Sequence, residues 1–118
     1  MANSPSDQDY DIYSAALEMT RKAILLLDEL LPKVIDQNIH DDLEAELLSI
    51  ERERLDLTQR FRAYEANPAG ITPPDAAALK NVTDLSSQVD AANADQAQAQ
   101  GVLTLTEDVA DTASKLFT

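Results

Sequence analysis

A lone histidine followed by two acids is the part of this sequence that is most similar to a catalytic or metal-binding site. His40 precedes Asp41 and Asp42, and imidazole and carboxylate groups bind divalent metals and transfer protons. Metal sites in helical bundles need a Glu-x-x-His pair on each of two helices, whereas Gln37 stands three residues before His40 and no second histidine exists. We therefore interpret His40 as a solvated loop residue beside a helix start.

Two acidic stretches, 41–46 and 51–53, offer clustered carboxylates to calcium. They lack the alternating acids and central glycine of a calcium loop, so we interpret them as solvated helix faces. The candidate nucleophiles Ser14 and Ser49 have no base partnered with them in the sequence, and cysteine, a glycine-rich phosphate loop and a G-x-S-x-G sequence are all missing. The sequence predicts a protein that is not an enzyme and uses no metal or cofactor.

The one basic cluster consists of Arg52, Arg54, Arg60 and Arg62. These arginines are spread over opposite sides of a predicted helix, and those near its C-terminus complement the helix dipole. Arg54 is the exception because it falls on the apolar face. We favour an Arg54 side chain that extends along this face toward acidic partners, and the alternative is a buried ionic contact that sets register or partner choice.

Hydrophobic periodicity predicts two helices of similar length in the first half of the chain. The first covers 9–37, with a kink before Pro32 and no full stop there. A boundary at 38–41 leads to the second helix, 41–66, in which Asp41 and Glu44 resemble a capping box. We expect these helices to form an antiparallel hairpin.

A third helix is predicted over 73–117, capped by Thr72 and marked by apolar or small residues at heptad spacing. As one continuous helix, this segment would be about 65 Å long and would extend beyond the hairpin by about 25 Å. Gly101 is the weak point at which it would otherwise break, giving a fourth helix over 102–117. We favour the continuous helix, because the heptad phase is the same on both sides of Gly101. Its overhang would need covering by another chain or by folding back.

The fold we predict is all-α: an elongated antiparallel bundle of three long helices with coiled-coil-like packing, or of four if the third breaks at Gly101. Residues 1–8 are expected to be a disordered tail and 9–118 a single domain. No 18-residue apolar run and no ordinary signal peptide are present, so we expect a soluble protein in the cytoplasm.

The net charge of −13 disfavours nucleic acid and anionic membranes as partners. We expect a protein interaction module, such as an adaptor, a small chaperone or an immunity-type inhibitor of a basic partner. The alternatives are an assembly subunit that self-associates through its long third helix, and an acidic mimic of nucleic acid. The residues expected to bind a partner are large apolar side chains at the aromatic end of the hairpin and near the C-terminus: Tyr10, Tyr13, Phe61, Tyr64, Leu103, Val109, Leu116 and Phe117.

Overall fold

The N-terminus of the first helix is stabilised by a reciprocal pair of hydrogen bonds. The structure is a computed structural model that describes residues 5–118, and its helix α1 spans Asp7–Leu30. The Ser6 hydroxyl accepts from the Asp9 N–H at 3.1 Å, and the Ser6 N–H donates to the Asp9 carboxylate at 2.9 Å. This capping box starts the helix before Asp9, the expected position. Residues 1–4 of the expected tail lie outside the described residues.

Pro32 ends the first helix instead of kinking it. α1 stops at Leu30, and a 3-10 turn, η1 (Leu31–Lys33), carries Pro32 near its start. Val34 is then extended, with φ −89° and ψ 120°. The predicted continuation to Gln37 was wrong, because proline lacks the N–H that a continuing helix would bond and its ring crowds the preceding turn.

Helix α2 spans Gln37–Ala66 and begins earlier than the sequence indicated. The Asp36 carboxylate caps it by accepting a hydrogen bond from the Ile39 N–H at 3.1 Å. The predicted start at Asp41 was wrong because Asp36 supplies the N-cap instead of Asp41. His40 therefore lies within a helix and not in a loop.

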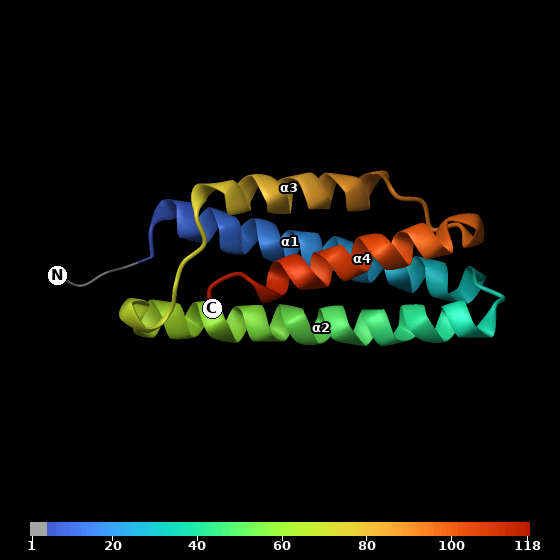
Figure 1. Cartoon of the computed structure of the whole chain (residues 1–118), viewed down its shortest axis with the longest axis horizontal. Coiled ribbons are helices and arrows are strands. Elements are labelled where there is room, and N and C mark those ends of the chain that lie inside the picture. Colours follow the sequence, from blue (N-terminus) through green and yellow to red (C-terminus); the bar gives the residue numbers. More distant parts are fainter. Residues whose placement is uncertain (1–4) are drawn as a thin grey trace.

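The end of α2 at Ala66 is as predicted. The Asn67 N–H completes the last turn by donating to the Ala63 carbonyl at 2.9 Å, and η2 (Pro68–Gly70) follows. Segment 67–75 then carries the chain from one side of the bundle to the other, as the yellow-green trace in Figure 1 shows.

Helix α3 spans Ala76–Ala91. Asp75 occupies its N-cap position but makes no side-chain cap hydrogen bond, so the predicted start at Pro73 with Thr72 as the cap was wrong. The Thr72 N–H instead donates to the Thr118 carbonyl at 2.8 Å. This bond ties the crossing segment to the C-terminal residue.

The predicted continuous third helix is broken well before Gly101. α3 ends at Ala91, and Ala92 is extended, with φ −75° and ψ 142°. The Asp95 carboxylate then accepts from the Ala97 N–H at 3.1 Å and caps a short turn, η3 (Gln96–Gln98). Asn93 and Asp95, embedded in an Ala/Gln-rich run, are turn-forming residues whose side chains compete with helical hydrogen bonding.

Helix α4 spans Ala99–Ser114 and contains Gly101 in its first turn, so Gly101 is not the break point. Folding back places the apolar face of α4 against the rest of the bundle, which a continuous helix would have left in water. The buried residues of this helix are Ala99, Val102, Leu103, Thr106, Val109 and Ala113.

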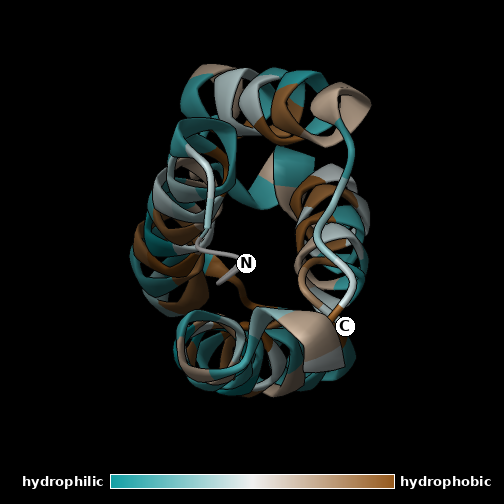
Figure 2. Cartoon of the chain, turned by 90° about the vertical axis from the view of Figure 1, so that its left-hand side faces the viewer, coloured by the Kyte–Doolittle hydropathy of each residue, from teal (hydrophilic) through white to brown (hydrophobic). Residues whose placement is uncertain are grey.

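The described residues form four α-helices that run alternately in opposite directions (Figure 1). The most extensive packing is between the parallel pairs α1 with α3 and α2 with α4, and α1 also packs against α2. Viewed end-on, the helices surround one core, with α3 diagonally opposite α2 (Figure 2). The long diagonal crossing 67–75 produces this order, and the molecule measures 57 × 22 × 15 Å along its principal axes.

Residues 5–118 contain no strand, so the predicted all-α, elongated antiparallel bundle is confirmed. Its single hydrophobic core draws on every helix and on the C-terminal residues Leu116 and Phe117. The predicted 25 Å overhang is absent because α4 returns along the hairpin. The chain itself therefore covers the apolar stripe that we expected to need a partner.

Replacing Gly101 with alanine tests the position of the break. An added Cβ at Gly101 would meet no other atom within 4 Å. We expect Gly101→Ala to raise the free energy of unfolding by about 0.5 to 1 kcal/mol, since alanine loses less backbone entropy in a helix. Urea denaturation measures this change, and a loss of stability would show that Gly101 is needed as a hinge.

Candidate functional site

The aromatic residues predicted to share one end of the hairpin meet there in the structure. The Tyr13 and Phe61 rings stack with centroids 4.1 Å apart, and Tyr10 and Tyr64 approach Phe61 edge-on at 5.2 and 6.1 Å. Phe117 joins them, 5.0 Å from Phe61 and 5.6 Å from Tyr64. The cluster thus joins α1, α2 and the C-terminus.

Most of this aromatic cluster faces the interior. Phe61, Tyr64 and Phe117 are only 2%, 5% and 0% exposed. Tyr13 is half-buried, and Tyr10 is 43% exposed. A partner could contact Tyr10 directly, whereas it could reach the buried three only if the bundle opened.

Two tyrosine hydroxyls at this end have unequal surroundings. The Tyr64 hydroxyl donates to the buried Asp9 carboxylate at 2.9 Å, and the Tyr10 hydroxyl donates to Glu65 at 2.9 Å on the surface. Burial, followed by the hydrogen bond to Asp9, raises the pKa of Tyr64 above its ordinary value. The Asp9 carboxylate links the α1 cap to α2, because it also accepts from the Ser6 N–H.

The C-terminal residues predicted to bind a partner are also in the core. Leu103, Val109, Leu116 and Phe117 are 8%, 0%, 4% and 0% exposed. Phe117 has a φ of 54°, a left-handed conformation that side chains adopt rarely and that holds its ring among the other aromatics. A partner would have to displace α4 to contact these side chains.

Arg60 has a role that its position in the sequence did not reveal. Its guanidinium donates to the Ala113 carbonyl at 2.8 Å and to the Leu116 carbonyl at 3.1 Å. The Ala113 carbonyl lies in the last turn of α4 and also accepts a hydrogen bond from the Leu116 N–H, and Leu116 lies just beyond the helix. Arg60 of α2 therefore caps a helix far away in the chain, which helix periodicity alone could not predict.

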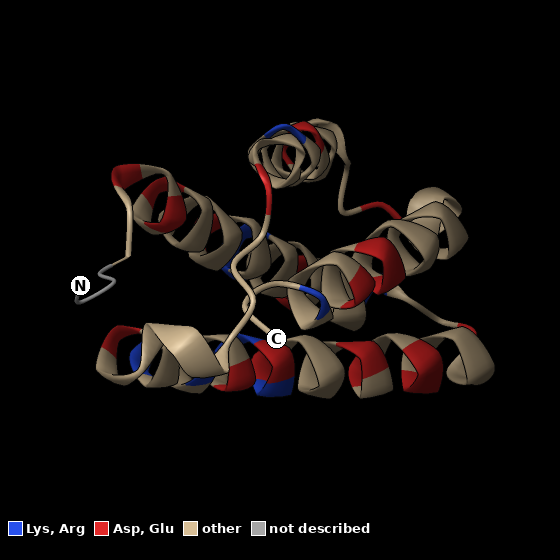
Figure 3. Ribbon diagram, turned by 60° about the vertical axis from the view of Figure 1, so that its left-hand side comes forward, with Lys and Arg blue, Asp and Glu red and all other residues tan. Residues whose placement is uncertain are grey.

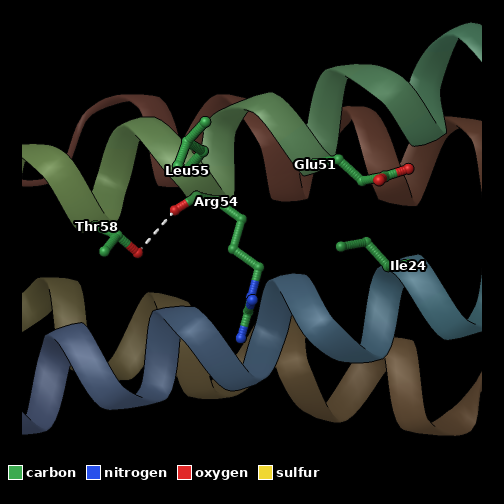
Figure 4. A pocket seen from close by; sticks show the side chains of 5 residues that line it. All are labelled: Ile24, Glu51, Arg54, Leu55 and Thr58. Atoms are coloured by element: carbon green, nitrogen blue, oxygen red, sulfur yellow. Dashed lines mark hydrogen bonds between the residues drawn. The ribbon is translucent and has the colours of Figure 1, made fainter.

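Arg54 extends from α2 toward α1, beside a cavity of about 250 Å³ (Figure 4). Its Nε atom is buried without a hydrogen-bond partner, and no ion pair within residues 5–118 includes it. The hydrogen bond from Arg21 lowers the pKa of Glu18, and the charge of Arg54 adds to this effect. Besides Arg54, the residues that line the cavity are Ile24, Glu51, Leu55 and Thr58.

The most exposed large apolar side chains lie largely outside the predicted candidates. Ile35 is 85% exposed on the connection between α1 and α2, and Leu25 is 50% exposed on α1. Leu48 and Leu55 are 61% and 57% exposed on α2. Because they are seven residues apart, these two leucines share one face of the helix, which the sequence analysis did not single out.

A groove runs along the outside of α3 and α4, which pack together less extensively than the other neighbouring helices. Two adjoining cavities of about 350 and 340 Å³ form it, and both are lined by Asn81 and Thr112. The floor includes Ala78, Leu85 and Leu116. The charged residues that line the groove are Asp75, Asp84, Asp108, Asp111 and Lys115.

The groove has an excess of carboxylates. Lys115 pairs with Asp111 at 2.9 Å and Lys80 pairs with Asp84 at 2.9 Å, and all four side chains are more than half exposed. Such exposed pairs contribute little stability and exchange readily with other ions. Asp108 is in no ion pair within the described part of the chain, so the groove retains negative charge.

The acidic positions do not form a metal site among residues 5–118, where no group of three or more potential ligands converges. Glu46 of α2 lies near Glu107 of α4, and burial, followed by the charge of Glu107, raises the pKa of Glu46. The Nδ1 atom of His40 is buried without a hydrogen-bond partner. Acids occur on every helix and not on one face alone (Figure 3).

Comparisons with protein families, with curated proteins and with solved structures found no match for this chain. Among the described residues, no helix combines the length and the apolar character that crossing a lipid bilayer requires.

Removing the Tyr64 hydroxyl tests the buried hydrogen bond at the aromatic end. We expect Tyr64→Phe to lower the free energy of unfolding by about 1 to 3 kcal/mol, because the buried Asp9 carboxylate loses a donor. Tyr10→Phe is the matched control, and the loss of its exposed hydrogen bond should cost under about 1 kcal/mol. Thermal and urea denaturation measure both variants, and equal effects would contradict the assignment.

Proposed function

We propose that this protein is a non-enzymatic interaction module that binds a basic segment of another protein in the groove between α3 and α4. The observation that carries the proposal is a groove with an apolar floor and acidic walls. Aspartates from both helices line it, and Leu85 and Leu116 provide apolar contact area. A segment with alternating basic and apolar side chains matches this arrangement.

Electrostatics favours such a partner over the other classes. A net charge of −13 raises the local concentration of basic proteins and repels phosphate-bearing polymers and surfaces. Arginines of a partner can replace Lys80 and Lys115 in their exposed pairs at little cost. An adaptor, a small chaperone and an inhibitor of a basic partner would each act by binding such a basic segment.

The alternative functions have less support. An assembly subunit that associates through a long third helix lacks that helix, because the chain turns at 92–95. A mimic of nucleic acid would gather its acids along one face, whereas they are spread over all four helices (Figure 3).

A designed peptide of alternating arginine and leucine residues, titrated into isotope-labelled protein, tests the proposal. We expect NMR shift changes to concentrate on groove residues such as Asn81, Gln88 and Thr112. The double variant Asp108→Asn/Asp111→Asn should weaken binding about fivefold or more, because each exposed ion pair is worth up to about 1 kcal/mol.

The matched control is Asp28→Asn/Glu29→Gln on α1, which also removes two negative charges, but from exposed positions outside the groove. This control should bind the peptide nearly as well as the unaltered protein. Equal weakening by both double variants, or shift changes spread over all helices, would mean attraction by net charge alone and would contradict a groove site.

A further inference from the structure

Helix α3 contributes fewer buried side chains to the core than any other helix of the bundle. Its buried residues are Val82 and Val89, whereas α1, α2 and α4 bury nine, five and six residues. α4 has the same length as α3, so the difference is not one of size. The free energy that holds α3 in place therefore comes from a small apolar area.

The other three helices form a closed unit without α3. α1, α2 and α4 each pack against the other two, and the rings of Tyr13, Phe61 and Phe117 join them at the aromatic end. α3 packs against α1 and more loosely against α4, and it lies diagonally opposite α2 (Figure 2). If α3 moved away, the contacts among the other three helices would remain.

The close approach of α3 to α1 buries little side-chain area. Besides its two valines, the apolar residues that α3 turns toward the core are only half-buried, as at Ala78, Leu79 and Leu85. Helices pack at shorter distances where the side chains between them are small. The ion pair between the two helices joins Lys22 to Asp90 at 2.8 Å, and these side chains are 27% and 57% exposed. A pair this exposed adds little stability.

Both ends of α3 are tied to the rest of the molecule by hydrogen bonds outside the helix. Before α3, the Thr72 N–H donates to the Thr118 carbonyl at 2.8 Å. After α3, the Lys33 ammonium donates to the Ala94 carbonyl at 2.9 Å. We call the segment between these two ties, residues 73–93, the strap.

We infer that the strap opens as one unit while α1, α2 and α4 stay folded, and that it is a movable side of the α3/α4 groove. Folded proteins open most readily in regions with few buried apolar contacts, and α3 has the fewest among the four helices. Because the strap stays tied at both ends, it recloses without refolding of the other helices.

The closed and open forms differ at the groove. Asn81, Asp84 and Gln88 line it from α3, and Asp108 and Thr112 line it from α4. Opening removes the α3 side, so only the closed form has the groove, and a basic segment bound there would stabilise the closed form. This consequence rests on the proposed function, whereas the opening itself is a property of the free protein.

Native-state hydrogen exchange of the free protein tests the opening, because each amide reports the least costly opening that exposes it. The Thr83 and Ser86 amides of α3 should share one protection factor, at least about tenfold below those of Leu57 on α2 and Val109 on α4. A shared value identifies one cooperative opening, since fraying from a helix end gives graded values.

Two variants separate opening of the strap from unfolding of the whole bundle. Ile50→Val, at a fully buried position of α2, should lower the protection of Leu57 roughly three- to tenfold and leave Ser86 unchanged, because it weakens a core that stays folded when the strap opens. Val82→Ala weakens the closed strap relative to both the open and the unfolded forms. It should therefore lower the protection of Ser86 and Leu57 by similar factors.

Equal protection of Ser86 and Leu57 in the unaltered protein would overturn the inference, because α3 would then open only when the bundle unfolds. An Ile50→Val chain in which both amides lose protection by the same factor would overturn it as well.

The link to the groove is tested by adding the arginine–leucine peptide at about ten times its dissociation constant, which should raise the protection of Ser86 about tenfold. A peptide that binds in the groove without this rise would contradict the role of the strap as its side. A peptide that does not bind would contradict the proposed function alone, because exchange of the free protein measures the opening without it.

Discussion

The packing of Phe117 into the aromatic end of the α1/α2 hairpin is the contact on which the rest of the structure depends. Its ring lies 5.0 Å from Phe61 and 5.6 Å from Tyr64, fully buried, and Arg60 holds the end of α4 beside it through two carbonyls. Short helices such as α3 and α4, of 16 residues each, draw most of their stability from tertiary packing. By anchoring the C-terminus, this contact closes the core.

Closure of the core determines which apolar side chains of this protein are buried and which are exposed. The apolar side chains of α4 and most of the aromatic cluster are buried in the core. Their apolar character in the sequence does not distinguish them from the residues of a binding surface. What remains outside is a groove between α3 and α4 that is lined by aspartates, and two exposed leucines on α2, Leu48 and Leu55. The partner that we propose for the groove is a basic segment of another protein.

The sequence was sufficient for the helical class, the end of α2 and the meeting of the aromatic residues, because periodicity and the Asn-Pro-Ala-Gly loop are local signals. It was insufficient where a small side chain decides between two local structures. Asp36, and not Asp41, caps α2. Asp95 caps a short turn within a run of residues that favour a helix. Long-range contacts such as Arg60 to the α4 carbonyls and Thr72 to Thr118 leave no local pattern at all. The partner-binding candidates were chosen for apolar character, which cannot distinguish a core residue from an exposed one.

The distance between the start of α3 and the end of α4 tests most directly whether the chain closes on itself. Asp75→Cys/Lys115→Cys places two spin labels at positions that line the same cavity in the folded-back structure. Double electron–electron resonance on dilute protein should give a distance under about 25 Å for the closed bundle, whereas a continuous helix would separate the two positions by about 60 Å. The long distance would contradict the closed core and would return the C-terminal apolar stripe to the surface.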